Sequence, residues 1–123
     1  MSALWVFLML LPALMMLAVG GLFRFGAVYK INWAFGYRTA RSMKNRVTWL
    51  FAHRYFGRRW LILGLILLPL AVVAVIIMFS LNLRPEVFVA VTSSVHLAAM
   101  LVPIYFTEKA LKRIFDEQGN RRA

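Results

Sequence analysis

Three long stretches without a charged side chain constrain this fold more than any other feature of the sequence. They cover residues 1–23, 60–83 and 87–106, with histidine taken as neutral. A helix rises about 1.5 Å per residue, so about 20 residues cross a hydrocarbon core of about 30 Å. The residues between the stretches are too few to cover three such helices in a soluble bundle. We therefore predict an all-α membrane protein, a single membrane domain over residues 1–123, with spans at about 3–23, 60–83 and 87–106.

The composition excludes two other broad classes of protein. Apolar residues make up 63% of the chain, and the formal net charge is +11. A disordered chain is poor in aliphatic and aromatic residues, and a soluble domain of this size cannot bury so much apolar surface. The chain has no cysteine, so disulfides, thiolate metal sites and cysteine nucleophiles are excluded as well.

The cations are distributed unevenly between the stretches. The segment 24–59 carries nine Lys and Arg residues and no acid, and the tail 107–123 carries five more, whereas the link between the second and third spans carries only Arg84. The positive-inside rule therefore predicts a basic cytoplasmic loop at 24–59 and a cytoplasmic tail at 107–123. The N-terminus and the turn at Arg84 are then expected outside. The first stretch is expected to stay uncleaved, because no positive side chain precedes it as in a signal peptide.

Part of the basic loop has the pattern of an amphipathic helix, within about 42–57. Asn45 is expected to cap this helix at its start, with Thr48 at the third position, and Gly57 to end it. We predict that this helix lies in the plane of the cytoplasmic interface, with anionic lipid headgroups at its basic face. A docking surface for a protein partner is the alternative. The apolar stripe that carries this interpretation has helical spacing: Val47, Leu50, Phe51 and Tyr55.

The same loop contains an ordered set of residues: Asn32, then Gly36-Tyr37-Arg38-Thr39, Ser42, Asn45 and Trp49. This order resembles the signature of the SdpI-type family of small bacterial membrane proteins. The name-giving member is an immunity protein against a secreted peptide toxin. The resemblance implies a multi-pass protein of the bacterial cytoplasmic membrane with an immunity or signalling role. The chain departs from the family pattern at His53, where an asparagine is expected.

The chemistry of the motif residues fits either a structural role or a binding role. Gly36 permits a backbone turn beside bulky neighbours. Arg38 offers a planar fork to a phosphate, a carboxylate or helix-end carbonyls, and Ser42 and Asn45 favour local caps and turns. The motif is therefore either a folded element that returns the chain to the interface or a binding site for a ligand or partner. The candidate binding residues are Asn32, Gly36, Tyr37, Arg38, Thr39, Ser42, Asn45 and Trp49.

Polar residues also occur inside the third stretch. Thr92 and Ser93 precede His96 by four and three positions, so a helix places all three on one face near the middle of the span. An ionisable residue at this depth is a functional candidate, either as a proton-sensitive switch or as a contact for an intramembrane peptide. A neutral histidine with a purely structural hydrogen bond is the alternative. Glu86 and Glu108 are expected to cap the two ends of this helix.

No combination of residues indicates catalysis. The four acids are scattered, the two histidines lie in different regions, and no metalloprotease, phosphate-loop or serine-hydrolase motif occurs. We therefore predict no enzyme activity, no metal and no cofactor. Nucleic acid is not expected as a partner, because the cations flank the spans. The predicted function is an SdpI-like role through binding a peptide toxin or protein partner. An accessory subunit of a larger membrane complex and an oligomeric transporter or lipid-handling protein are the alternatives, and a homo-oligomer is left open.

Overall fold

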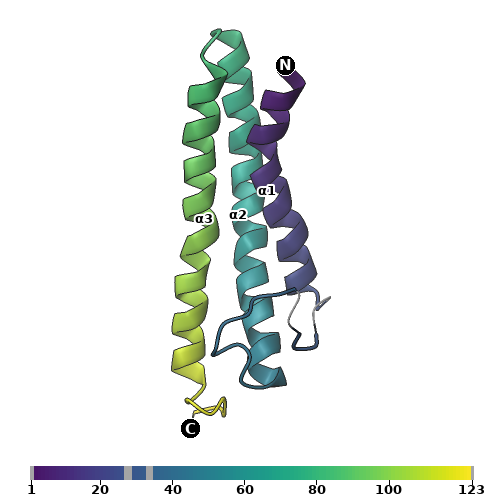
Figure 1. Cartoon of the computed structure of the whole chain (residues 1–123), viewed down its shortest axis with the longest axis vertical. Coiled ribbons are helices and arrows are strands. Elements are labelled where there is room, and N and C mark those ends of the chain that lie inside the picture. The colour runs from purple at the N-terminus through teal and green to yellow at the C-terminus, as the bar shows by residue number, and fades with distance from the viewer. Residues whose placement is uncertain (1, 27–28, 33–34, 123) are drawn as a thin grey trace.

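The computed structural model describes residues 2–26, 29–32 and 35–122. It contains three long helices that stand side by side (Figure 1): α1 at Ser2–Arg24, α2 at Arg46–Ser80 and α3 at Pro85–Ile114. Each helix is long and apolar enough to cross a membrane. The prediction of an all-helical protein with three helices suited to span a membrane is therefore confirmed.

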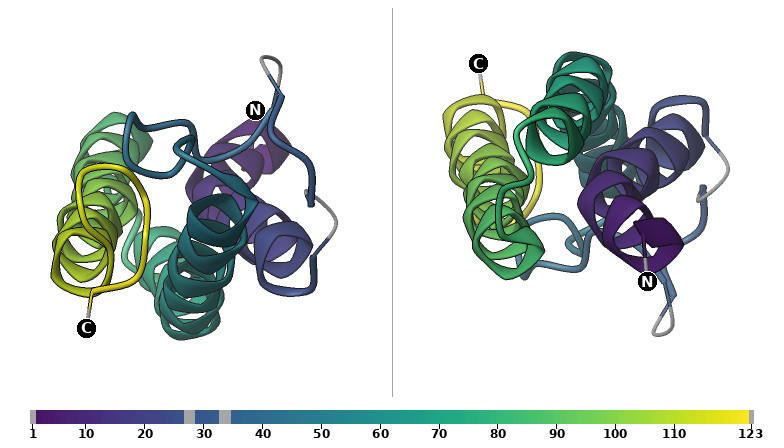
Figure 2. Two further views of the ribbon diagram at one scale, coloured as in Figure 1. Left: turned by 90° about the horizontal axis from the view of Figure 1, so that it is seen from below. Right: turned by 90° about the horizontal axis from the view of Figure 1, so that it is seen from above.

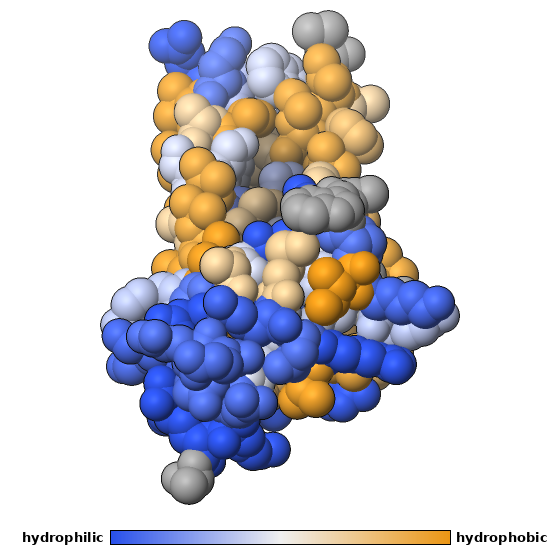
Figure 3. Space-filling model, turned by 60° about the horizontal axis from the view of Figure 1, so that its bottom comes forward, coloured by the Kyte–Doolittle hydropathy of each residue, from blue (hydrophilic) through white to orange (hydrophobic). Residues whose placement is uncertain are grey.

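The two ends of the bundle differ in chemistry. The start of α1 and the turn between α2 and α3 lie at one end, whereas α1 ends, α2 begins and α3 ends at the other (Figure 1). The end views show the three helices at the corners of a triangle, with the α1–α2 connection folded across the second end (Figure 2). Hydrophilic residues gather at this second end, and hydrophobic residues cover the helix shafts (Figure 3). We call the second end the basic end.

The predicted interfacial helix is not a separate element, and this part of the fold prediction was wrong. α2 runs for 35 residues from Arg46 without a break, about 52 Å at 1.5 Å per residue. It therefore joins the expected loop helix to the second span and extends well beyond a hydrocarbon core. The start of the helix was predicted correctly, because Asn45 and Thr48 form a capping box. The expected end at Gly57 was wrong, since Gly57 lies inside the helix.

Gly57 is explained by the close approach of α1. A Cβ atom on Gly57 would lie 2.7 Å from the Gly20 carbonyl oxygen and 2.5 Å from the Arg24 backbone nitrogen. A Cβ atom on Gly20 would in turn lie 2.9 Å from the Gly57 carbonyl oxygen. The two glycines therefore let the backbones of α1 and α2 touch, as small residues commonly do between membrane helices. Glycine at position 57 serves this contact and does not terminate the helix.

The buried residues of α2 near the basic end lie on a different face from the predicted apolar stripe. Trp49, Ala52 and Phe56 are buried together with Phe23 of α1 and Leu111 of α3 in the larger of two hydrophobic clusters. The residues of the predicted stripe are only half-buried or, at Val47, 60% exposed. The larger hydrophobic cluster therefore sits at the basic end, and Leu50 and Phe51 of the predicted stripe pack only against its edge.

Helix α3 begins and ends differently from the expected span. Pro85 starts it and Glu86 lies in its first turn, where a carboxylate favours the positive end of the helix dipole. The helix continues past the expected end at 106 as far as Ile114. Glu108 is consequently inside α3 and does not cap it, which corrects the expectation for this residue.

The glycine contact between α1 and α2 can be tested with two neighbouring substitutions. Gly20→Ala is expected to destabilise the protein by about 1–3 kcal/mol, because the new methyl group would collide with backbone atoms of α2. Gly21→Ala is the matched control, since its Cβ would meet only a flexible Leu61 side-chain carbon at 3.9 Å. The measurement is the thermal or denaturant midpoint in mild detergent. Equal midpoints for both variants would contradict the proposed contact.

Candidate functional site

The motif loop, defined as residues 35–45, begins with a bend that lies against α2. Gly36 has φ of +132°, and a Cβ atom there would lie 2.7 Å from His53 Nε2 and 2.9 Å from the Trp49 ring. Glycine is required because it has no Cβ and tolerates positive φ. The loop therefore lies directly on the aromatic surface of α2.

His53 of α2 accepts a hydrogen bond from the backbone of the motif loop. The Tyr37 backbone N–H donates to His53 Nε2 at 2.8 Å, and His53 Nδ1 lies 2.8 Å from the Trp49 carbonyl oxygen. Because the carbonyl can only accept, Nδ1 carries the proton and the ring is neutral. His53 is buried and packs against Trp49, with ring centroids 4.2 Å apart. His53 is thus part of the site.

Glu108 of α3 joins the loop through a single carboxylate oxygen. The Tyr37 hydroxyl donates to Glu108 Oε2 at 2.5 Å, and the Thr39 hydroxyl donates to the same atom at 2.9 Å. Hydrogen bonds from hydroxyls to a carboxylate are short and strong. Burial, and then the neighbouring Glu108, raise the pKa of the Tyr37 phenol. The phenol therefore keeps its proton and remains a donor.

The next part of the loop is closed by its own side chains. Ser42 Oγ accepts the Thr39 backbone N–H at 2.9 Å and donates to the Tyr37 carbonyl at 2.8 Å. The Thr48 hydroxyl donates to the Ser42 carbonyl at 3.0 Å. The Asn45 Nδ2 group donates to the Gly119 carbonyl at 2.8 Å. These bonds connect the loop, the start of α2 and the tail after α3.

The structure brings most predicted motif residues together, but in structural roles. Tyr37, Thr39, Ser42, Asn45 and Trp49 belong to the loop–helix contact described above. Asn32 forms a local turn, in which its Oδ1 accepts the Phe35 N–H at 2.7 Å and its Nδ2 donates to the Lys30 carbonyl. Arg38 is exposed at the surface of the motif loop. The interpretation of the motif as a folded element therefore accounts for its hydrogen bonds, and Arg38 is the motif side chain that is presented outward.

The sequence did not predict that three residues belong to this site: His53, Glu108 and Gly119. Glu108 lies about 70 positions from the loop residues that it binds, so no local pattern links them. Gly119 has φ of +85°, and a Cβ atom there would lie 2.6 Å from Asn45 Nδ2. A lone acid directly after an apolar stretch was the available signal for Glu108, but it was interpreted as a helix cap.

The intramembrane polar residues of α3 differ in burial. His96 is buried, and its Nδ1 lies 2.6 Å from the Thr92 carbonyl oxygen, whereas Ser93 is exposed. The Thr92 hydroxyl donates to the Phe88 carbonyl at 2.8 Å. Within the described part of the chain, His96 Nε2 has no hydrogen-bond partner. Among the same residues, no cluster of three His, Cys, Asp or Glu side chains has the arrangement of a metal site.

The hydrogen bond between Tyr37 and Glu108 is expected to contribute measurably to the free energy of unfolding. Tyr37→Phe is expected to cost about 1.5–3 kcal/mol, because it removes a partly buried hydrogen bond to a carboxylate while keeping the ring. Tyr105→Phe is the control, since Tyr105 is 63% exposed. The unfolding midpoint in mild detergent measures both. A Tyr37→Phe variant as stable as the control would argue against the bond.

Gly36 gives a second prediction that separates strain from collision. Gly36→Ala combines positive φ with a clash against two rings of α2, and it is expected to release the motif loop. Gly26→Ala introduces strain alone, because Gly26 has φ of +84° with no atom within 4 Å of its Cβ position. Hydrogen exchange of residues 35–45 is expected to increase strongly in the first variant only. Similar protection in both variants would contradict the close contact.

Comparison with known proteins assigns the chain to a family. The family model described as the SdpI/YfhL protein family matches residues 28–107, about two thirds of the chain. The match includes the motif loop, all of α2 and α3 as far as Thr107, one residue before Glu108. Neither the curated proteins nor the solved structures gave a match. The resemblance seen in the sequence is thus confirmed, and the chain belongs to the SdpI/YfhL family.

Proposed function

We propose that this protein is an immunity or signalling protein of the bacterial cytoplasmic membrane. Family membership supports the role. The concentration of cations supports an orientation with the basic end in the cytoplasm, because fourteen of the fifteen Lys and Arg residues lie in the segments 24–59 and 107–123. The start of α1 and the turn between α2 and α3 then face outside.

We infer that the ligand, a peptide toxin or a protein partner, binds within the membrane along α3. The expected outer surface is small, so helix faces provide most of the contact area. Only 11% of the apolar window of α3 is buried inside the protein, compared with 28% for α1. Ser93 and Ser94 are exposed in the middle of this helix. Small residues and hydroxyl groups favour helix–helix contact in a membrane.

The observation that carries a signalling role is the bond between α3 and the motif loop. Glu108 holds the hydroxyls of Tyr37 and Thr39, and Arg38 lies between these two residues with an exposed side chain. A ligand that shifts α3 would therefore change the position of the loop and of Arg38. In this proposal the membrane face of α3 receives the ligand, and the motif loop delivers the response at the basic end.

The proposal can be tested by toxin protection in cells. Bacteria that produce the protein are challenged with a panel of secreted peptide toxins, and survival is compared at matched membrane levels of each variant. Wild-type protein is expected to protect against at least one toxin. Glu108→Ala and Arg38→Ala are expected to lose most of that protection, whereas Glu117→Ala, an exposed acid of the tail, retains it.

Binding and response are distinguished by a second measurement. Ser93→Leu with Ser94→Leu is expected to abolish capture of the protective toxin by the purified protein, while Glu108→Ala still captures it but does not protect. Unchanged survival across the whole panel would overturn the immunity proposal. Stable co-purification with another membrane protein, in the absence of any toxin effect, would instead favour an accessory subunit.

A further inference from the structure

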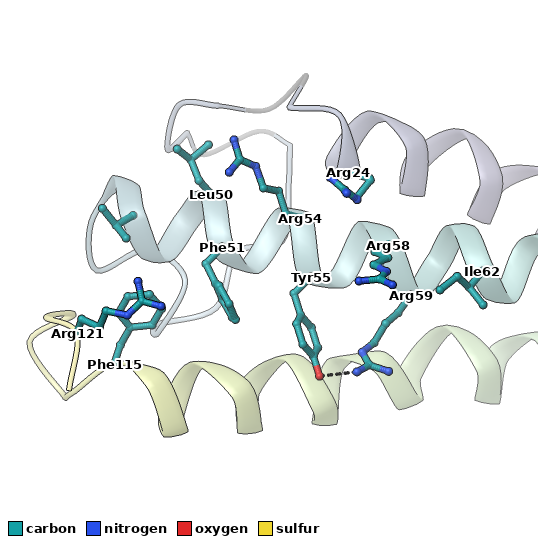
Figure 4. A pocket seen from close by; sticks show the side chains of 11 residues that line it. Arg24, Leu50, Phe51, Arg54, Tyr55, Arg58, Arg59, Ile62, Phe115 and Arg121 are labelled. Carbon is teal, nitrogen blue, oxygen red and sulfur yellow. Dashed lines mark hydrogen bonds between the residues drawn. The ribbon is translucent and has the colours of Figure 1, made fainter. Parts of the chain in front are cut away.

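The surface of α2 that faces away from the motif loop forms a groove at the basic end. The groove has a volume of about 850 Å³ and lies between the end of α1, the outer face of α2 and the tail after α3 (Figure 4). Its floor includes Leu50, Phe51 and Tyr55, which belong to the half-buried stripe of α2. We call it the arginine groove because five arginines line it: Arg24, Arg54, Arg58, Arg59 and Arg121.

The arginine groove has no acid among its described lining residues to balance its positive charge. The salt bridge found in the described part of the chain joins Arg84 and Glu86, at the opposite end of the bundle, and does not involve an arginine of the groove. Five guanidinium groups in one groove repel one another, and arginine forks match the oxygens of a phosphate. The groove is therefore complementary to a phosphate-bearing anion.

One of the arginines is already held in position. Arg59 Nη2 donates to the Tyr55 hydroxyl at 2.7 Å, as the dashed line in Figure 4 shows. Its guanidinium carbon lies 4.5 Å from the centre of the Tyr55 ring and 5.5 Å from that of Phe106 on α3. A side chain fixed in this way loses less conformational entropy when it binds an anion. The groove thus contains an ordered cation beside an aromatic wall.

The apolar floor favours a lipid over a free anion. It continues along α2 to Ile62, which lies inside the uncharged stretch 60–83 and is 46% exposed. A ligand that fills the groove therefore meets charge at one end and a membrane-level apolar surface at the other. Free phosphate has no group for the apolar part, and an acidic soluble peptide would not extend to membrane depth. An amphiphile with an anionic head has both groups.

We propose that the arginine groove is a specific binding site for one anionic phospholipid, with its phosphate among the arginines and an acyl chain along α2 toward Ile62. Basic pockets beside membrane helices bind such headgroups. This site is independent of the proposed immunity role, because it uses the face of α2 opposite to the motif loop and does not involve the exposed face of α3.

The experiment measures lipid binding by native mass spectrometry of the delipidated full-length protein in mild detergent. The probes are cardiolipin, phosphatidylglycerol, phosphatidylethanolamine and inorganic phosphate. We expect one anionic lipid to bind per chain, phosphatidylethanolamine to bind weakly and inorganic phosphate not to compete at equal concentration. Arg54→Gln with Arg58→Gln is expected to weaken anionic lipid binding about tenfold or more.

The control removes the same charge from the same end of the protein. Lys112→Gln with Arg113→Gln changes two exposed residues of α3 that do not line the groove, and it is expected to bind lipid almost as the wild type does. Arg54→Lys with Arg58→Lys keeps the charge but loses the forks, and an intermediate affinity is expected. Circular dichroism verifies the fold of each variant.

Three results would overturn the proposal. Equal losses in the groove variant and in the charge-matched control would indicate a general electrostatic attraction to lipid. Effective competition by inorganic phosphate would indicate an anion site without a lipid component. Preferential capture of an acidic peptide, with no saturable binding of either anionic lipid, would indicate a protein-docking surface.

Discussion

The carboxylate of Glu108 is the contact on which the arrangement of the basic end depends. Membrane helices gain little from apolar contact with each other, because lipid is equally apolar. Polar bonds and close backbone packing must therefore hold such a bundle together. Glu108 accepts hydroxyl groups from Tyr37 and Thr39, and the Tyr37 backbone donates to His53. One loop thus connects α3 with α2, while the paired glycines 20 and 57 bring α1 against α2.

This organisation separates the packed part of the protein from the part that faces the membrane. The larger hydrophobic cluster, with Trp49 and Phe56, lies at the basic end. The shafts of the helices expose many large apolar side chains, and α3 is the least buried of the three. The family motif is consequently explained largely as an architectural element that fixes the helices at one end. It leaves most of the apolar face of α3 exposed, and Arg38 is exposed on the motif loop.

The first turns of α2 have two faces with different chemistry. One face carries Trp49, His53 and Phe56 and packs against the motif loop and the ends of the other helices. The other face carries Leu50, Phe51 and the arginines of the groove. A helix that continues about 20 Å beyond the hydrocarbon core can hold both surfaces at a fixed height above the membrane. The ligand proposals for α3 and for the arginine groove therefore concern separate sites.

The sequence by itself determined the three spans and the capping box at Asn45, because charge-free length and capping are local properties. It also indicated the family, through residues that are close together in the chain. Tertiary structure decided the rest. Gly57 lies inside a helix and provides room for the close approach of α1, and Glu108 binds residues about 70 positions away. The apolar stripe at Leu50 is only half-buried, because the aromatic residues at 49 and 56 occupy the buried face of α2 and pack against the motif loop. These outcomes depend on contacts between distant segments, which spacing along one helix does not encode.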